Sequence, residues 1–279
     1  MIEVKDRIPT YPGRIKLIPV EGQANTYDMV RADEPVEPGT PLDKALFDSF
    51  ANEINALQKR VSDSLFAMTQ RTALENVAIG TEIGLYENGV LVPFIVLSKA
   101  YDNSGRVLVV RKNCYKMDTL FDAGENFYTD CKTDKWLSNE YIACLDEATQ
   151  GVLATVSLDI AVANKLTSIP RKVFLLSAWE YNARYTQVGQ YEGDVLTYFD
   201  TNDKRVAKYL GSPVVHYTRT VSYTSGDDDC DAISATGTVV AETDPVTVLH
   251  GIRPAFTLPL GFEVTVGVHD ELATAEVIE

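Results

Sequence analysis

The pattern of hydrophobic and polar positions changes twice along the chain, and these changes predict three segments. Residues 1–40 contain short β-like runs, such as Ile15–Val20 and Tyr27–Val30, each bounded by turn-forming residues. A segment of this length cannot bury a core of its own. We therefore expect residues 1–40 to fold against a partner or a symmetry mate.

The second segment has the pattern of a long helix. Thr40 is a suitable N-cap, Pro41 stands at the first helical position, and neither Gly nor Pro follows up to Thr72. Apolar residues then recur in alternating steps of three and four, with Ser64 at the one polar position; they are Phe47, Phe50, Ile54, Leu57, Val61 and Met68. This heptad spacing predicts a parallel homo-oligomeric coiled coil over residues 41–74. The mixed residues of the seam leave the number of strands open, but their size favours more than two, and we expect a homotrimer. The alternative is a long helix packed on its own chain.

The third segment, residues 79–279, is dense in strand and turn patterns. Ile83 to Val92 predicts a hairpin that turns at residues 87–89. Two apolar runs, 93–98 and 106–110, predict buried strands on either side of a turn at 102–105. Two short helices are expected at 136–143 and 146–153, and a long loop-rich region follows the strand at 172–177. This mixture predicts an α+β head domain whose long loops carry its function.

The net charge of the chain limits the classes of partner that we expect it to bind. The 40 Asp and Glu residues outnumber the 25 Lys and Arg, which gives a net charge of −15. This acidity argues against nucleic acid, because phosphate binding depends on clustered basic side chains, and it weakens the case for an anionic membrane surface. No basic N-terminal region precedes an apolar stretch, and no apolar run approaches the roughly 18 residues of a membrane span. We expect a soluble protein made in a cytosol.

Aromatic residues concentrate in the loop-rich region. Trp179, Tyr181, Tyr185, Tyr191, Tyr198, Tyr209, Tyr217 and Tyr223 fall within one short window. Tyrosine combines a large apolar face with a polar tip, which suits recognition surfaces and stacking on sugars. We predict that several of these side chains form a ligand-binding face, while the others fill the core.

The sequence gives weaker support for metal-binding or catalytic groups than for the aromatic binding face. The densest carboxylate cluster comprises Asp227, Asp228, Asp229 and Asp231, which suits calcium in a flexible loop but lacks EF-hand spacing, so a solvated acidic loop is the simpler interpretation. The four cysteines and three histidines lack the short spacing of a zinc site. Neither a Gly-x-Ser-x-Gly elbow nor a phosphate-binding glycine loop occurs. We predict a protein that is not an enzyme and needs no cofactor, with calcium as the one ion to test.

Two stretches near the N-terminus resemble a known module. Residues 6–14 (DRIPTYPGR) and 31–42 (RADEPVEPGTPL) are similar to the N-terminal module of tail-fibre and baseplate-associated proteins from bacteriophages of Firmicutes-type gut hosts. In that group the "RADEP…GTPL" segment leads into a helix. The resemblance covers roughly the first 45 residues. It implies that residues 1–40 attach the protein to other structural proteins of a virion.

The third segment resembles a second family. Residues 136–141 (WLSNEY), 173–177 (VFLLS) and 251–256 (GIRPAF) are similar to an uncharacterised domain of phage tail and gut bacterial surface proteins. That domain has a predicted C-type-lectin-like fold, akin to formylglycine-generating enzymes. Where that family has a "WLRSP" segment this chain has Tyr217–Thr220, in which Arg219 is the shared residue. The resemblance implies a C-type-lectin-like head over residues 79–279 and adds Arg219 to the candidate ligand residues.

Together these resemblances imply a virion-attached fibre or receptor-binding protein, assembled in the cytoplasm of a bacterial host, whose head binds a host-surface glycan or protein. A capsid decoration or head-fibre protein without a dedicated receptor is the first alternative, and a surface-glycan depolymerase is the second. Residues 1–78 carry 9 basic and 12 acidic side chains, so the remaining 16 and 28 leave a net charge of −12 on the head. Such a head needs specific contacts to adhere to an anionic cell wall.

Overall fold

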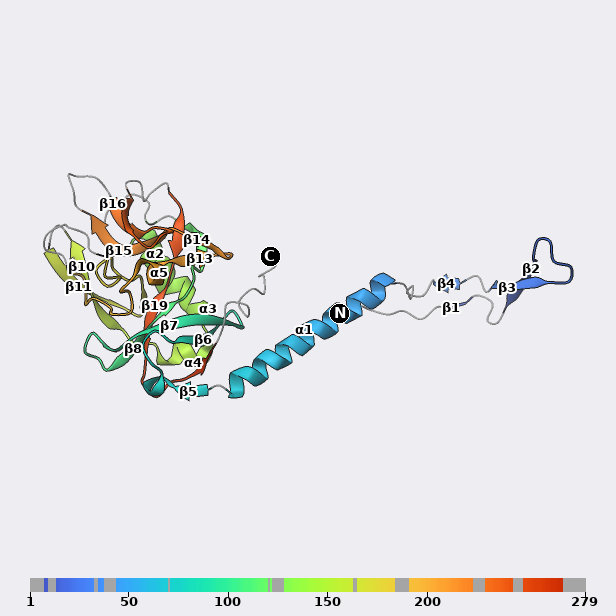
Figure 1. The fold of residues 1–279 in the computed structure, drawn as a ribbon, viewed down its shortest axis with the longest axis horizontal. Helices are drawn as coiled ribbons and strands as arrows, with labels where there is room; N and C mark the ends of the chain where they lie inside the picture. The colour runs from blue at the N-terminus through green and yellow to red at the C-terminus, as the bar shows by residue number, and fades with distance from the viewer. Residues whose placement is uncertain are drawn as a thin grey trace. The chain divides into compact units, whose positions relative to one another are not determined.

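The computed structural model describes residues 8–9, 14–32, 35–37, 44–69, 71–119, 121, 128–162, 165–183, 191–222, 229–242 and 248–267. The chain divides into two compact units, residues 1–62 and 63–279 (Figure 1). Among the described residues, no helix combines the length and the apolar character needed to cross a bilayer.

Unit 1, residues 1–62, contains two small antiparallel ribbons and most of one helix. β1 (Ile8–Pro9) pairs with β4 (Pro35–Glu37), and β2 (Ile15–Pro19) pairs with β3 (Tyr27–Arg31). Helix α1 begins at Lys44 and ends at Thr69. None of the described side chains of residues 14–32 is buried, and Met29 is 73% exposed. An isolated two-stranded ribbon is at best marginally stable in water, and the described side chains of residues 14–32 form no buried core that would hold β2 and β3 in place.

The predicted coiled coil over 41–74 is not supported. Within the described residues α1 is the one long helix, because the others have three to six residues, so this part of the chain contains no helix pair of the coiled-coil type. α1 is also shorter than predicted. Its heptad positions Phe47, Ile54, Leu57 and Val61 are more than half exposed, Phe50 is half-buried, and the side chain of Met68 lies outside the described ones. The homotrimer loses the support that the coiled coil gave it.

The predicted fold class is also wrong. Strands make up 42% and helices 22% of the residues that the structure describes, so this part of the chain is mostly β-sheet rather than α+β. The two short helices expected at 136–143 and 146–153 are present. The first lies in a helical run made of α2 (Lys132–Trp136), the π-helical turn η2 (Leu137–Tyr141) and α3 (Ile142–Cys144), and the second is α4 (Glu147–Val152). These pieces cover a β-rich body, so the C-type-lectin-like mixed head is not retained.

The main sheet of unit 2 has seven strands in the order β12-β19-β8-β7-β6-β20-β5. All neighbouring pairs are antiparallel. The strands are β5 (Arg71–Ala73), β6 (Glu82–Glu87), β7 (Val90–Tyr101), β8 (Arg106–Arg111), β12 (Val173–Phe174), β19 (Ala255–Leu258) and β20 (Glu263–Val266). The hairpin at 83–92 and the buried strands on either side of residues 102–105 were predicted and are confirmed.

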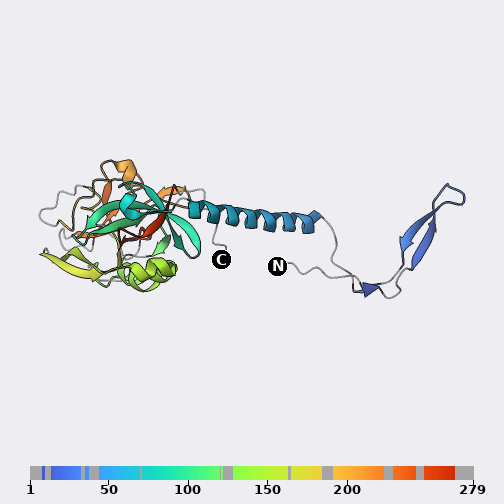
Figure 2. The same ribbon diagram turned by 90° about the horizontal axis from the view of Figure 1, so that it is seen from below.

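A second sheet has five strands in the order β17-β16-β15-β18-β9, in which β15 and β18 run parallel. The strands are β9 (Lys116–Thr119), β15 (His216–Ser222), β16 (Asp229–Ile233), β17 (Val239–Glu242) and β18 (His250–Ile252). Two ribbons complete the unit: β10 (Val156–Val162) with β11 (Lys165–Arg171), and β13 (Ala207–Tyr209) with β14 (Ser212–Val214). Short helices η1 (Leu74–Asn76) and α5 (Asn202–Arg205) lie in the connections. Figure 2 shows the β10–β11 ribbon, in yellow-green, at the margin of unit 2.

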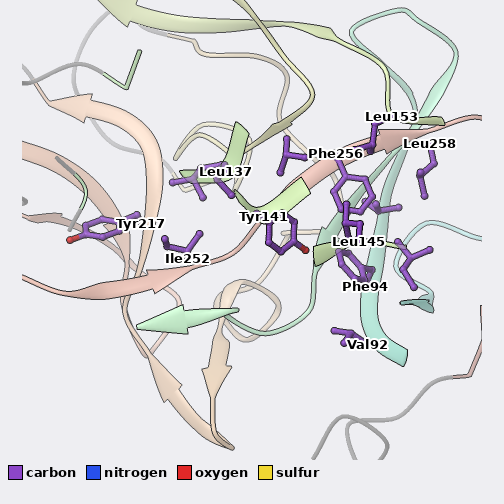
Figure 3. Close-up of a cluster of buried hydrophobic side chains, with 14 of the residues drawn as sticks. Val92, Phe94, Leu137, Tyr141, Leu145, Leu153, Tyr217, Ile252, Phe256 and Leu258 are labelled. Atoms are coloured by element: carbon purple, nitrogen blue, oxygen red, sulfur yellow. The ribbon is translucent and has the colours of Figure 1, made fainter. Parts of the chain in front are cut away.

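Both faces of the seven-stranded sheet are buried, because alternate residues of β7 and β8 enter two different cores. Phe94 and Val109 belong to a core shared with the short helices and the five-stranded sheet. Figure 3 shows Leu145 and Phe256 beside Phe94, and Leu137, Tyr141 and Ile252 further along the same cluster. Ile95, Leu97, Leu108 and Val110 enter the second core, which they share with β10 and the loops after β12. Because both faces of the sheet are buried, these strands have continuous apolar runs in the sequence rather than alternating apolar and polar residues.

Candidate binding site

An exposed aromatic pair lies on the loops that follow β12. The ring centroids of Trp179 and Tyr191 are 4.5 Å apart, with the ring planes inclined by 58°. Trp179 is half-buried and Tyr191 is 58% exposed. The turn that carries Trp179 is closed by its carbonyl, which accepts from the Asn182 N–H at 2.9 Å, with Asn182 in the left-handed region that asparagine tolerates. Together the two rings form an accessible apolar surface with one phenolic hydroxyl, which suits a sugar ring or an apolar peptide side chain.

Beneath the pair lies a fully buried ion pair. Arg219 of β15 donates to both carboxylate oxygens of Glu180, from Nη1 at 2.5 Å and from Nη2 at 3.0 Å, and both residues are 0% exposed. The hydroxyl of Tyr101, at the end of β7, donates to Glu180 Oε1 at 2.5 Å, and the Ser177 N–H donates to Oε2 at 2.9 Å. Every side of the Glu180 carboxylate is therefore occupied by a donor, which is what a charge in a dry interior requires.

Arg219 connects several segments in addition to Glu180. Its guanidinium donates to the backbone carbonyls of Leu175, Asp159 and Glu192 at 3.0, 3.2 and 3.0 Å. Burial by itself lowers the pKa of Arg219, but the neighbouring Glu180, the Tyr101 hydroxyl and Glu192 raise it above its usual value. Arg219 is thus permanently charged, and it holds β10, β12 and the loop at 192 in a fixed arrangement.

Glu192 is a second buried carboxyl, directly next to Tyr191 and 1% exposed. It accepts from the Ala161 N–H of β10 at 2.7 Å and from the Thr220 hydroxyl of β15. Burial raises the pKa of Glu192 to about 7, although Arg219 and these two hydrogen bonds lower it and the nearby Glu180 raises it further. A carboxyl that is half-ionised near neutral pH therefore lies next to the exposed pair.

The buried groups fix the backbone on either side of the aromatic pair. The Ala178 N–H donates to Thr220 Oγ1 at 3.0 Å, next to Trp179. The Ser177 hydroxyl donates to the Glu192 carbonyl at 2.6 Å, next to Tyr191. Gly193 has a positive φ of 86°, and a Cβ there would lie 2.5 Å from Glu180 Oε1, so only glycine fits against the carboxylate. Both loops of the pair are consequently tied to the same network.

Most of the other predicted ligand residues are placed in the interior. Tyr181 and Tyr217 are each 1% exposed, and the ring of Tyr181 packs on Phe199 at 4.6 Å. Tyr198 is half-buried, also against Phe199. A ligand reaches only accessible atoms, so the structure gives Tyr181, Tyr217 and Arg219 structural roles. Tyr185 and Tyr223 lie outside the described residues. Among the candidate residues that the structure describes, Trp179 and Tyr191 are the pair in ring contact with one ring exposed to solvent.

The predicted calcium ligands receive no support from the described residues. Asp227 and Asp228 lie outside them, Asp229 is in β16 with its side chain outside the described ones, and Asp231 is 2% exposed. In the part of the chain that the structure describes, no group of three His, Cys, Asp or Glu side chains is placed to hold a metal. All four cysteines are free thiols, and burial raises the pKa of Cys114 to about 12, which makes it unreactive.

Sequence reasoning missed Glu180, Glu192, Tyr101 and Ser177. One signal was present: Ser177 and Glu180 follow a buried strand directly, at a spacing of three, where a serine and an acidic side chain can bond reciprocally to each other's backbone. The structure shows this arrangement, since the Glu180 N–H donates to Ser177 Oγ at 3.0 Å and the Ser177 N–H donates to Glu180 Oε2. The partner Arg219 lies 39 residues further along the chain, and no local pattern indicates it.

Comparison with known proteins identifies one domain. Residues 104–260 match a family described as "Domain of unknown function (DUF6273)". No curated protein matches the chain, and no solved structure matches it. The family description names neither a phage protein nor a lectin-like domain, so those resemblances remain predictions. The match spans more than half of the 279 residues and includes both loops of the aromatic pair and the buried ion pair beneath it. The chain belongs to the DUF6273 family.

Proposed function

We propose that this chain is a bacteriophage structural protein, a virion-attached fibre or receptor-binding protein in which unit 2 binds a glycan or protein on the host surface. The observation that carries the proposal is the exposed Trp179–Tyr191 pair on a rigid base. Two aromatic rings held by buried hydrogen bonds form a preorganised anchor, and anchors of this type contribute most of the affinity of a binding surface.

The surroundings of the pair favour binding over catalysis. The carboxyls adjacent to the pair in sequence, Glu180 and Glu192, are 0% and 1% exposed, and their oxygens accept hydrogen bonds from the protein. A general acid or base must reach the proton that it transfers, and neither carboxyl reaches the surface in this structure. The depolymerase is therefore the less favoured alternative.

Unit 1 supports the attachment part of the proposal. The β2–β3 ribbon exposes Leu17 by 53%, Tyr27 by 53% and Met29 by 73%, on the face where Leu17 pairs with Met29. Exposed apolar side chains on a ribbon without a core are typical of a segment that is stabilised by another molecule. We propose that this partner is another structural protein of the virion, bound through residues 1–40.

The test is adsorption of the full-length chain to host cells and to an array of host-envelope glycans. Trp179→Ala and Tyr191→Ala should each weaken binding by at least about tenfold, which corresponds to about 1.4 kcal/mol for one aromatic anchor. Leu210→Ala is the matched control, because Leu210 is an 87% exposed apolar residue in the turn between β13 and β14 and should leave binding unchanged.

The outcomes separate the three functions. Binding that depends on Trp179 and Tyr191 supports the receptor-binding protein. Binding that is absent, or indifferent to both substitutions, overturns the proposal for this site and favours a decoration protein. Release of reducing sugar from envelope polysaccharide by the same chain would favour the depolymerase.

A further inference from the structure

Glu192 is placed to control the geometry of the aromatic pair. Its neighbour in sequence is Tyr191, and its carboxylate is joined through Thr220 Oγ1 to the N–H of Ala178, the neighbour of Trp179. Its other oxygen accepts from the Ala161 N–H of β10. One carboxylate therefore bridges the two aromatic loops and fastens them to a strand of the scaffold.

We propose that Glu192 is a positioning residue that makes the Trp179–Tyr191 pair sensitive to pH, because its ionised form holds both loops through charge-assisted hydrogen bonds and its protonated form holds them through weaker, neutral ones. The role of the pair in ligand binding rests on the proposed function, whereas the change of its geometry with pH does not. Neither the family match nor the sequence indicates such a regulation of the site.

The hydrogen bonds themselves give the reason. The ionised carboxylate accepts two donors, the Ala161 N–H and the Thr220 hydroxyl, while Thr220 Oγ1 accepts from Ala178. A proton from solvent that binds Oε2 reverses the bond to Thr220: the carboxyl O–H then donates to Thr220 Oγ1, whose second lone pair still accepts from Ala178, and the Thr220 hydrogen turns away. Oε1 still accepts from the Ala161 N–H. Both loops stay linked, but their hydrogen bonds no longer have a charged acceptor and are therefore weaker.

The charged groups around Glu192 keep both forms within the physiological range. From β15 it faces Arg219, and from the turn after β12 it faces Glu180, which is bonded in turn to Tyr101 of β7. β10 contributes the Ala161 backbone, while Asp159 of that strand accepts a hydrogen bond from Ser168. Burial raises the pKa of Glu192 to about 7, with Arg219 lowering and Glu180 raising it. The pair should thus be held most tightly above neutral pH and loosened below it.

Tryptophan fluorescence of the full-length chain tests this without any ligand. The protein has two tryptophans, Trp136 and Trp179. We expect the emission to change between about pH 5.5 and pH 8.5 with a midpoint near the Glu192 pKa of about 7. Trp179→Phe should abolish the change, which assigns the signal to the pair rather than to Trp136.

Glu192→Gln should lose the transition, because its amide mimics the protonated carboxyl: the oxygen accepts from Ala161 and the nitrogen donates to Thr220. Asp194→Asn is the matched control, since Asp194 is an exposed carboxylate on the same loop, and it should keep the transition. Thr220→Val, which removes the bridging hydroxyl at nearly constant volume, should also lose it. This second variant keeps the test decisive if Glu192→Gln does not fold by circular dichroism.

A flat wild-type profile would overturn the inference, as would a transition that persists unchanged in folded Glu192→Gln or Thr220→Val. Adsorption to host cells at about pH 6 and pH 8 then separates the two proposals. A fluorescence transition without any adsorption removes the receptor-binding function and leaves the positioning role of Glu192 intact. Adsorption to host cells without a fluorescence transition would support the receptor-binding function and overturn the positioning role of Glu192.

Discussion

Replacing Arg219 with methionine tests whether the buried ion pair organises unit 2. Methionine retains much of the side-chain volume but removes the five hydrogen bonds that the guanidinium donates to Glu180 and to three backbone carbonyls. The carboxylate of Glu180 would keep its bonds to Tyr101 and Ser177 but would lose its countercharge. An uncompensated charge in the interior is among the most destabilising changes that a single substitution makes.

The magnitude follows from the burial of both partners. Both side chains are 0% exposed, so solvent does not screen the pair, and breaking such a pair typically costs about 3–5 kcal/mol. Unit 2 comprises residues 63–279, a size at which 1 kcal/mol lowers the melting temperature by about 2–4 °C. We expect Arg219→Met to lower the melting temperature of unit 2 by roughly 6–20 °C.

Urea denaturation followed by circular dichroism measures the free energy of unfolding, and two further variants calibrate it. Arg71→Met breaks the ion pair of Arg71 with Glu263, in which both side chains are more than half exposed and 3.7 Å apart, and it should cost less than about 1 kcal/mol. Combining Arg219→Met with Glu180→Gln should recover part of the loss, because no charge is then left unpaired. A cost below about 1 kcal/mol for Arg219→Met, or a double variant as unstable as the sum of its parts, would contradict this reasoning.

Two further predictions concern stability. Because burial raises the pKa of Glu192 to about 7, the folded state favours the protonated form of this residue. The contribution of protonated Glu192 to the free energy of unfolding is fully present below the ordinary carboxyl range and is lost as pH rises through about 7. The free energy of unfolding should therefore fall by about 3 kcal/mol between roughly pH 4.5 and pH 8 relative to Glu192→Gln, measured by urea denaturation at each pH. At Gly237, with a φ of 78°, a Cβ would lie 2.0 Å from the backbone oxygen of Asn202, so Gly237→Ala should cost more than about 3 kcal/mol. Gly105→Ala, at a φ of 69° in open space, should cost only about 1 kcal/mol, and equal losses in thermal melts would show that backbone conformation rather than the clash decides.

The sequence predicted those parts of the fold that short-range patterns specify. The hairpin of β6 and β7 and the buried strand β8 follow from apolar runs and from turn residues such as Asn88 and Gly89, both of which have positive φ. Heptad spacing likewise indicated a helix within residues 41–74, and α1 lies there. Spacing along one chain does not show whether a second helix is present, so the step from helix to coiled coil went beyond what the pattern contains.

The candidate site was only partly predictable, because residue type does not determine exposure. Tyrosine and tryptophan occur both in cores and at recognition surfaces. Tyr181 and Trp179 stand two positions apart on the same turn, yet Tyr181 is 1% exposed while Trp179 is half-buried. Arg219 was taken for a ligand residue because it is the residue shared with the "WLRSP" segment of the family that the third segment resembles. Its pairing with Glu180 depends on tertiary contacts between distant segments.

The buried Arg219–Glu180 ion pair beneath Trp179 and Tyr191 is energetically costly, so its presence needs a reason other than stability. Apolar packing of equal volume would stabilise unit 2 as well or better, but it would not fix the direction of loops that lack regular secondary structure. Arg219 bonds to carbonyls of Leu175, Asp159 and Glu192 as well as to the Glu180 carboxylate, so it fixes the segments that carry Trp179 and Tyr191 against one strand of the scaffold. Restricting the loops before a ligand arrives lowers the entropy that binding must overcome. On this argument, the Arg219→Met, Glu180→Gln double variant should bind host cells more weakly than wild type even under conditions where it is fully folded, because it restores charge balance without restoring the directed hydrogen bonds.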